Sequence, residues 1–325
     1  MIFRGSSKRI TQAGVTPPAV GRRRSTGRRT GVAAAAGIVA VVTIGAMSLS
    51  TASAAGATSR TNTRDSSAGT GTHSGRSSTS EWKLKWQTNF SESAPLGSFS
   101  GCNNNDGTPA ALCTGLPVGL QSQWWAYPYP WPDTATETHL PLGGYYDPSE
   151  TVWISGGQMH IRMFRTTQWI HSAAVVPKAA IGMLYGKYVE WFSVSADPSP
   201  GYKSAHLLWP TDNALPGSEV DFPEGNWNSN ICAYVHSPSE SSVPSFCPAA
   251  TTWTTWHTSV IDWTPDSLTF YMDGKETGSV TGKWVPDEPM SWILQNESAL
   301  LGAEAPENSS AQINISSVAV YSYQG

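Results

Sequence analysis

Three acidic residues close together in the chain have the types and spacing for carboxylate chemistry. Glu219, Asp221 and Glu224 lie within six residues, and Val220 and Phe222 alternate with the first two acids. In a β-strand, successive side chains point to opposite faces, so Glu219 and Asp221 would share one face and the apolar pair the other. We expect the apolar face to join a core and the acidic face to line a surface or cleft.

Strict alternation would leave Glu224 on the wrong face of this strand. The alternating position on the acidic face is Pro223, which cannot donate a hydrogen bond to a sheet and is confined to edges and bulges. One extra residue in a β-bulge would return Glu224 to the face of Glu219 and Asp221. The sequence therefore predicts a bulged strand with three acids on one side.

Two of these acids could cleave a glycosidic bond. With the bulge, the Cα atoms of Glu219 and Glu224 are roughly 13 Å apart at ~3.3 Å per strand step, and side chains that lean inward cover much of that gap. Retaining glycosidases need carboxyl groups about 5–5.5 Å apart, and inverting enzymes about 6.5–9.5 Å. The spacing permits retention, in which one ionised carboxylate attacks the anomeric carbon and the other, protonated, releases the leaving sugar. A solvated acidic strand is the alternative.

Short strand-like runs dominate the sequence around the acids. Residues 81–325 show no clear amphipathic helix, but apolar runs rich in β-branched and aromatic residues recur between turn signals. Asp273-Gly274 and Ser155-Gly156-Gly157 follow such runs as hairpin turns do. This pattern predicts an all-β sandwich or barrel. The expected strands are 151–154, 158–163, 186–194, 258–263, 268–272 and 313–323.

The N-terminal part reads as an export signal. An Arg-rich start precedes an apolar run over residues 31–49, and Ala52-Ser53-Ala54 supplies the small residues of a cleavage site. The pairs Arg22-Arg23 and Arg28-Arg29 leave both Sec and twin-arginine export open, and an uncleaved anchor is a further alternative. We predict a signal peptide over 1–54, a Ser/Thr/Gly-rich linker over 55–80 and one secreted domain over 81–325, with no membrane segment in the mature, extracellular protein.

Charge and cysteines limit the partners and the folding environment. Beyond residue 60 the chain holds 11 basic and 24 acidic side chains, a net charge of −13, which would repel nucleic acid. An exported chain can form disulfides. Four cysteines allow three pairings among which sequence does not choose, and the simplest joins neighbours. The four are Cys102, Cys113, Cys232 and Cys247; their spacing lacks the C-x-x-C pattern of a zinc site.

The acidic motif and its flanks resemble a known family. Glu219 to Glu224, read as E-x-D-x-x-E, is similar to the signature of glycoside hydrolase family 16, in the bulged variant of its laminarinase-like members. The resemblance covers most of 81–325. It implies a concanavalin-like jelly-roll β-sandwich with a concave substrate cleft, with Glu219 as nucleophile, Asp221 as its helper and Glu224 as acid/base. Its flanking matches are 184–190, 206–210, 256–275 and 315–321.

The resemblance also implies a function and its alternatives. We expect a retaining endo-glycosidase acting on β-1,3- or mixed β-1,3/1,4-glucan. A non-catalytic carbohydrate-binding sandwich would be expected to lack one of the acids, and a transglycosylase would keep all three. We expect a monomer whose partner is a polysaccharide. No cofactor is expected, and a structural calcium ion is left open although no Asp-rich ligand loop occurs.

A few further residues are candidates for sugar contact. Trp209 could stack on a sugar ring or pack in the core, and His236 could bind a hydroxyl group or be structural. Trp256 and the neighbouring His257 lie where a strand should start, where packing competes with substrate contact. The aromatic loop 124–131 could bind carbohydrate or be buried over the edge of the sandwich. With 15 Trp in the chain, both uses of this residue are open.

Overall fold

The structure is a computed structural model that describes residues 81–104, 108–213, 217–248 and 251–325. The predicted signal peptide and linker, residues 1–80, lie outside the described residues. The first strand begins at Trp82, next to the expected start of the folded domain. Among the described residues, no helix is both long and apolar enough to cross a membrane.

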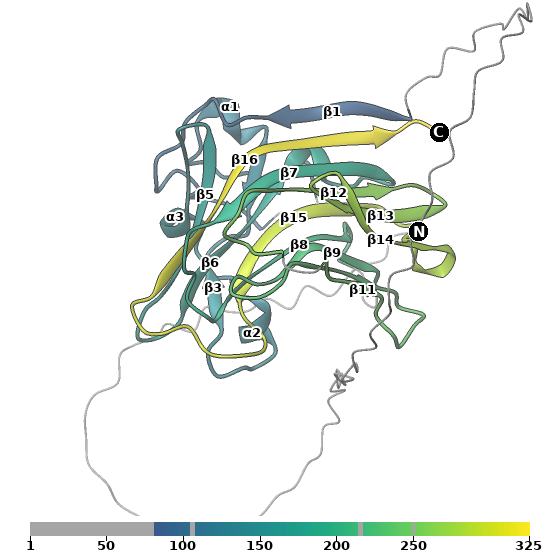
Figure 1. Ribbon diagram of the computed structural model, residues 1–325. Coiled ribbons are helices and arrows are strands. Elements are labelled where there is room, and N and C mark those ends of the chain that lie inside the picture. The colour runs from purple at the N-terminus through teal and green to yellow at the C-terminus, as the bar shows by residue number, and fades with distance from the viewer. Residues whose placement is uncertain (1–80, 105–107, 214–216, 249–250) are drawn as a thin grey trace, which may run out of the picture. The chain divides into compact units, whose positions relative to one another are not determined.

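The described chain is almost entirely β-structure (Figure 1). Its short helices are α1 (Val118–Gln121), α2 (Thr134–Glu137), α3 (Pro148–Thr151), η1 (Lys178–Ala180) and η2 (Gly282–Trp284). Its strands are β1 (Trp82–Thr88), β2 (Trp124–Ala126), β3 (Gly144–Tyr146), β4 (Val152–Ser155), β5 (Gln158–Arg165), β6 (Ile170–Pro177), β7 (Gly186–Val194), β8 (Tyr202–Pro210), β9 (Glu219–Asn226), β10 (Cys232–His236), β11 (Ser245–Phe246), β12 (His257–Trp263), β13 (Ser267–Met272), β14 (Lys275–Thr281), β15 (Met290–Ser298) and β16 (Ser310–Tyr323).

These strands form one sheet that folds back on itself into two layers. The order β11-β10-β9-β8-β15-β6 makes the layer that carries the acidic strand, called here the acid-bearing layer. The order β5-β16-β7-β12-β13-β14 makes the opposite layer. Strand β6 connects them, because Ile170 and His171 pair with β5 while residues 173–175 pair with β15. This arrangement confirms the predicted jelly-roll sandwich.

The hydrophobic periodicity placed the strands well. Apart from Thr151, which ends α3, each expected run lies on a strand: 152–154 on β4, 158–163 on β5, 186–194 on β7, 258–263 on β12, 268–272 on β13 and 313–323 on β16. The predicted hairpins also form. Asp273 and Gly274 join β13 to β14 with positive φ angles of 53° and 75°, and Gly156 and Gly157 join β4 to β5.

Aromatic side chains fill the space between the layers. Six tryptophans are less than 2% exposed, so much of the high Trp content serves the core: Trp124, Trp125, Trp227, Trp253, Trp263 and Trp292. On the acidic strand, Phe222 is fully buried, and its ring lies 5.3 Å from that of Phe270 on β13 in the opposite layer. This contact holds the apolar face of β9 against the core, so its acidic face points away from it.

One polar pair also spans the core. His206 on β8 and Glu190 on β7 are both fully buried, and His206 Nδ1–H donates to the Glu190 carboxylate at 2.8 Å. Ser259 Oγ donates to the same carboxylate at 3.2 Å. Because His206 points inward, its immediate neighbours on β8, Ala205 and Leu207, face the other way, with the acids.

Two disulfides join sequence neighbours, Cys102–Cys113 and Cys232–Cys247. This is the simplest of the three pairings that the sequence left open. The second bridge ties β10, the neighbour of the acidic strand, to the segment that follows β11. A cross-link near β9 limits how far this edge of the acid-bearing layer can open.

Candidate active site

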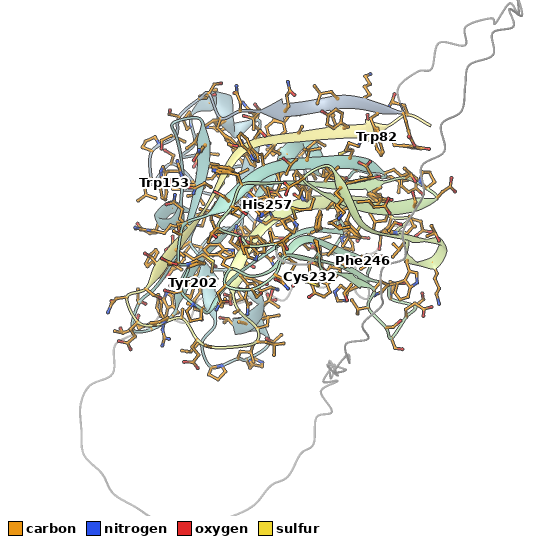
Figure 2. All side chains as sticks on the ribbon, in the orientation of Figure 1. Trp82, Trp153, Tyr202, Cys232, Phe246 and His257 are labelled. Atoms are coloured by element: carbon orange, nitrogen blue, oxygen red, sulfur yellow. A yellow bond between two sulfur atoms is a disulfide. The ribbon has the colours of Figure 1, made fainter. Side chains whose placement is uncertain are left out.

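The acidic strand β9 has the bulge that its sequence predicts. On β8, Ala205 pairs with Glu224 and Leu207 with Asp221, so two steps on β8 face three on β9. The same shift appears against β10, the neighbour on the other side. The extra residue lies at Phe222–Pro223, whose peptide bond is cis. Glu219, Asp221 and Glu224 therefore share one face of the sheet, and Figure 2 marks the flanking strands by Tyr202 on β8 and Cys232 on β10.

Gly225 makes room directly after the last acid. Its φ of +149° falls in the region that favours glycine, and a Cβ there would lie 2.5 Å from the backbone oxygen of Asn230. Neither the backbone conformation nor the close approach accommodates a side chain. The strand can therefore leave the bulge and turn toward Asn226 only with glycine at this position.

The register places specific side chains across the floor beside the acids. On β8, Lys203, Ala205, Leu207 and Trp209 alternate on the acidic face. Strand β15 lies on the other side of β8, and its Glu297, Gln295, Ile293 and Ser291 pair with those four residues in turn. On β10, Tyr234 pairs with Asp221 and His236 with Glu219. The acids thus lie in the middle of a floor built from four adjacent strands.

Burial and the charges of neighbouring acids raise the pKa of two of the three acids. Burial, followed by the charge of Glu224, raises the pKa of Glu219 to about 7. Burial and the charges of Glu219 and Glu224 raise the pKa of Asp221 well above its usual value. A hydrogen bond from Asp221 acts in the opposite direction on Glu219 and stabilises its ionised form. Asp221 is therefore a protonated donor to Glu219, the arrangement that supports Glu219 as an anion.

Glu224 has a cationic partner. Lys203 Nζ lies 2.7 Å from Glu224 Oε1 and 3.1 Å from Glu297 Oε1. Lys203 is 7% exposed and Glu297 1% exposed, and the other Glu297 oxygen accepts a hydrogen bond from Thr134 N at 3.3 Å. Burial lowers the pKa of Lys203, but the charges of Glu297 and Glu224 outweigh it and raise that pKa above its usual value. The ammonium group therefore stays charged between the two carboxylates.

A cavity of about 590 Å³ opens beside Glu219. Its walls are aromatic and polar, the composition of a sugar-binding site, where ring faces cover apolar C–H surfaces and polar groups bind hydroxyls. A second hollow of about 410 Å³ lies on the other side of the acids, against Lys203, Glu224 and Tyr234. The acids thus lie between two recesses, Glu219 lining the larger and Glu224 the smaller. Residues around the larger recess include Tyr127, Trp131, Glu137, Tyr146, Leu207 and Trp209.

The three predicted sugar-contact residues lie in different places. Trp209 lines the larger recess, where its indole N–H donates to Asn213 Oδ1 at 2.9 Å. His236 lies beside the acids, with Nε2 3.5 Å from Asp221 Oδ2. Trp256 is elsewhere: its ring lies 4.9 Å from that of Trp191, on β7 of the opposite layer. Glu190 points from β7 into the core, so Trp191 and Trp256 lie on the outer side of that layer, away from the acids.

The aromatic loop 124–131 has a mixed role. Trp124 and Trp125 are fully buried, whereas Tyr127 and Trp131 line the larger recess. Both readings of the loop therefore apply, to different residues. Sequence reasoning missed Lys203, Glu297, Glu137 and Tyr146 altogether. Lys203 gave the one usable signal, because it is a cation in a strand rich in apolar residues, where an unpaired charge is costly.

Among the described residues, one group could hold a metal ion. Glu219, Asp221 and His236 each bring a ligand atom within 4.8 Å of the others. Carboxylate and imidazole donors suit several divalent cations. Two of these donors are, however, the acids that share a proton in this site, and a cation there would compete with that proton.

The family relationship agrees with this site. Residues 158–316, which span strands β5 to β16 and all three acids, match the model of glycosyl hydrolases family 16. This stretch of the chain is similar to family 16 glycosyl hydrolases. This confirms the resemblance seen in the acidic motif and its flanks. No curated protein matches the chain.

Solved structures of the same family share the fold. The catalytic domain of a Thermotoga petrophila laminarinase, an endo-1,3-β-glucanase, is 16% identical with a TM-score of 0.54, over 75% of this chain and 99% of that one. The Rhodothermus marinus laminarinase is 17% identical with a TM-score of 0.56, over 75% and 98%. SCLam, a non-specific endo-β-1,3(4)-glucanase of family 16, is 16% identical with a TM-score of 0.55, over 76% and 93%. At these identities the likeness concerns the fold.

Proposed function

We propose that the protein is a secreted, retaining endo-β-glucanase that hydrolyses β-1,3- or mixed β-1,3/1,4-glucan. The observation that carries this proposal is the bulged strand β9, which presents Glu219, Asp221 and Glu224 on one face between two recesses. The match of residues 158–316 to the model of glycosyl hydrolases family 16 supports a glycosidase. The similar structures are named as laminarinases and β-1,3(4)-glucanases, which supports the choice of glucan.

Each acid has one role in the proposed reaction. The carboxylate of Glu219 attacks the anomeric carbon while Glu224 gives its proton to the glycosidic oxygen, and the sugar on the leaving side departs. Glu224 then removes a proton from water, which attacks the same carbon and frees Glu219. Asp221 donates its hydrogen bond to Glu219 when that carboxylate is an anion, before attack and after release.

The charge of the cleft favours a neutral substrate. Five acidic side chains face the cleft or lie beneath it, and Lys203 pairs with two of them. The five are Glu137, Glu219, Asp221, Glu224 and Glu297. A sulfated or carboxylated polysaccharide would meet uncompensated negative charge, whereas a neutral glucan would not. We therefore expect laminarin and lichenan to be substrates and carrageenan to be excluded.

Secretion and a monomeric state are part of the proposal. The two disulfides fit an oxidising compartment, which cytosolic proteins rarely meet. The predicted export signal over residues 1–54 supports the same location. A mass spectrum of the protein from culture medium would show cleavage near Ala54, and size-exclusion chromatography would report its mass.

Reducing-end release from a polysaccharide panel tests the activity. The purified chain is incubated with laminarin, lichenan, agarose, carrageenan and xyloglucan, beside Glu219→Gln and the matched surface variant Glu276→Gln on β14, whose side chain is exposed. We expect the wild type and Glu276→Gln to release sugars from laminarin or lichenan and Glu219→Gln to release none. Binding without release by all three proteins would favour a carbohydrate-binding role, and new longer chains without net release would favour a transglycosylase.

A further inference from the structure

We propose that Lys203 is a positioning residue of the hydrolytic site: held by Glu297, it fixes Glu224 in the cleft and sets the pH range over which the acids keep their catalytic proton. This proposal rests on the proposed function of the acids. Its observations are the two short contacts of Lys203 Nζ and the burial of both Lys203 and Glu297.

The strand register brings these three residues together. Lys203 on β8 pairs with Glu297 on β15, and Ala205, two positions further along β8, pairs with Glu224 on β9. Ala205 has only a methyl group, so the space beside Glu224 is open to the long side chain of Lys203. The side chains of two adjacent positions on one face of a sheet can meet in this diagonal way.

Glu297 serves to hold the cation in place. Its carboxylate is buried, binds Lys203 through one oxygen and accepts the N–H of Thr134 at the start of α2 through the other. A long side chain such as lysine loses considerable rotamer freedom when fixed, and a buried partner offsets that cost. Glu297 is therefore an anchor beneath the floor and does not face the sugar directly.

Lys203 acts on Glu224, which gives and takes the catalytic proton, and on Glu219, the nucleophile. Other titratable groups facing them are Asp221 on β9, Tyr234 and His236 on β10, and Glu297 on β15. Among these groups Lys203 is the permanent cation. Its ammonium group lies 2.7 Å from Glu224 Oε1 and so holds the carboxyl group that takes a proton from water in the second half of the reaction. It also lowers the pKa of Glu219, against the larger effects of burial and of Glu224.

The charges of Lys203 and Glu297 therefore have opposite effects on the same proton. Loss of the cation in Lys203→Met should make the acids keep their last proton to higher pH. Loss of the anion in Glu297→Gln leaves the charge of Lys203 less neutralised, so the acids should release that proton at lower pH. A charged partner within ~4–6 Å moves such a pKa by about 1–3 units. A purely structural pair would not move the two variants in opposite directions.

The experiment measures the pH profile of kcat/KM on the glucan that the wild type degrades. We expect the pH at which kcat/KM falls on the alkaline side to be about one unit or more higher in Lys203→Met than in the wild type, and to be lower in Glu297→Gln. Lys203→Arg keeps the charge and should keep the wild-type limb even if kcat falls. Because Lys203 positions an acid and does not bind the sugar, Lys203→Met should lower kcat more than it raises KM. Shifts in the same direction, or no shift, would overturn the proposal.

A second measurement does not depend on turnover. The carboxyl groups are titrated by difference infrared spectroscopy in the full chain, with Glu219→Gln used to assign the signal of Glu219. Because the charge of Lys203 lowers the pKa of Glu219, we expect protonated Glu219 to persist to higher pH in Lys203→Met than in the wild type. An unchanged titration would overturn the role of Lys203 even in an active enzyme. An inactive wild type with the expected titration shift would contradict the proposed glucanase but leave the coupling between Lys203 and the acids in place.

Discussion

The buried pair of His206 and Glu190 gives a stability prediction that can be worked from the structure. Both side chains are fully buried, and the His206 ring donates to Glu190 at 2.8 Å across the two layers. In His206→Leu, the one donor left to the carboxyl group of Glu190 among the described residues is the Ser259 hydroxyl. Breaking a buried pair by removing one partner costs about 3–5 kcal/mol. We expect His206→Leu to lower the free energy of unfolding by that amount.

Thermal unfolding measures this loss directly. For domains of 150–250 residues, each kcal/mol corresponds to roughly 2–4 °C, so His206→Leu should unfold about 6–20 °C below the wild type. The double variant His206→Leu/Glu190→Met removes both polar groups and should recover much of the loss. A matched control is His160→Leu, because His160 is only partly buried and bonds to Asn314 near the surface. We expect the control to change Tm little.

Two results would refute this reasoning. If His206→Leu unfolded within about 2 °C of the wild type, the pair would contribute little, contrary to the cost expected for a buried group left unpaired. If the double variant lost as much stability as the sum of the two single variants, the residues would act independently and would not form a coupled pair.

Three further predictions concern the cleft. Trp209→Ala should raise KM about 3–10-fold and leave kcat nearly unchanged, because a stacked aromatic ring contributes ~0.5–1.5 kcal/mol to binding. Trp191→Ala, on the outer side of the opposite layer, is the control. A fall in kcat alone would contradict a sugar-binding role for Trp209. Asp221→Leu should lower kcat about 10²-fold, and Asp221→Asn less, because an amide can still donate to Glu219; equal losses would argue against the donor role. The pKa of Glu219 is about 7 in the folded protein and about 4.5 in the unfolded chain, so between these pH values the folded state binds a proton that the unfolded state has released. The free energy of unfolding should therefore fall by on the order of 3 kcal/mol as the pH rises from 4.5 to 7, and fall less in Glu219→Gln. Equal urea midpoints across that range in both proteins would refute this.

The strands and the acidic motif could be predicted because their signals are local. Alternation of Val220 and Phe222 with the acids fixed which face of β9 is buried, and Pro223 marked the bulge. Turn residues such as Asp273 and Gly274 marked hairpins in the same way. Each of these features depends on neighbouring residues and backbone chemistry, which a single sequence shows directly.

The rest of the site depends on pairing between distant segments. Glu297 is 94 residues from Lys203, and only the register of β15 against β8 brings them together. The same holds for His206 and Glu190, which belong to different layers. Trp256 shows the reverse case: it precedes a strand, as expected, but that strand belongs to the layer opposite the acids. Strand order and layer are long-range properties, so periodicity alone could not assign these residues.

The stereochemistry of cleavage tests the central claim most directly. The purified chain is mixed with the glucan that it degrades, and proton NMR follows the anomeric signals of the new reducing ends before they equilibrate. Attack by Glu219, followed by attack of water from the opposite face of the sugar, predicts that the β-anomer appears first and that Glu219→Gln gives no signal. First appearance of the α-anomer, or unchanged cleavage by Glu219→Gln, would contradict the roles assigned to Glu219 and Glu224.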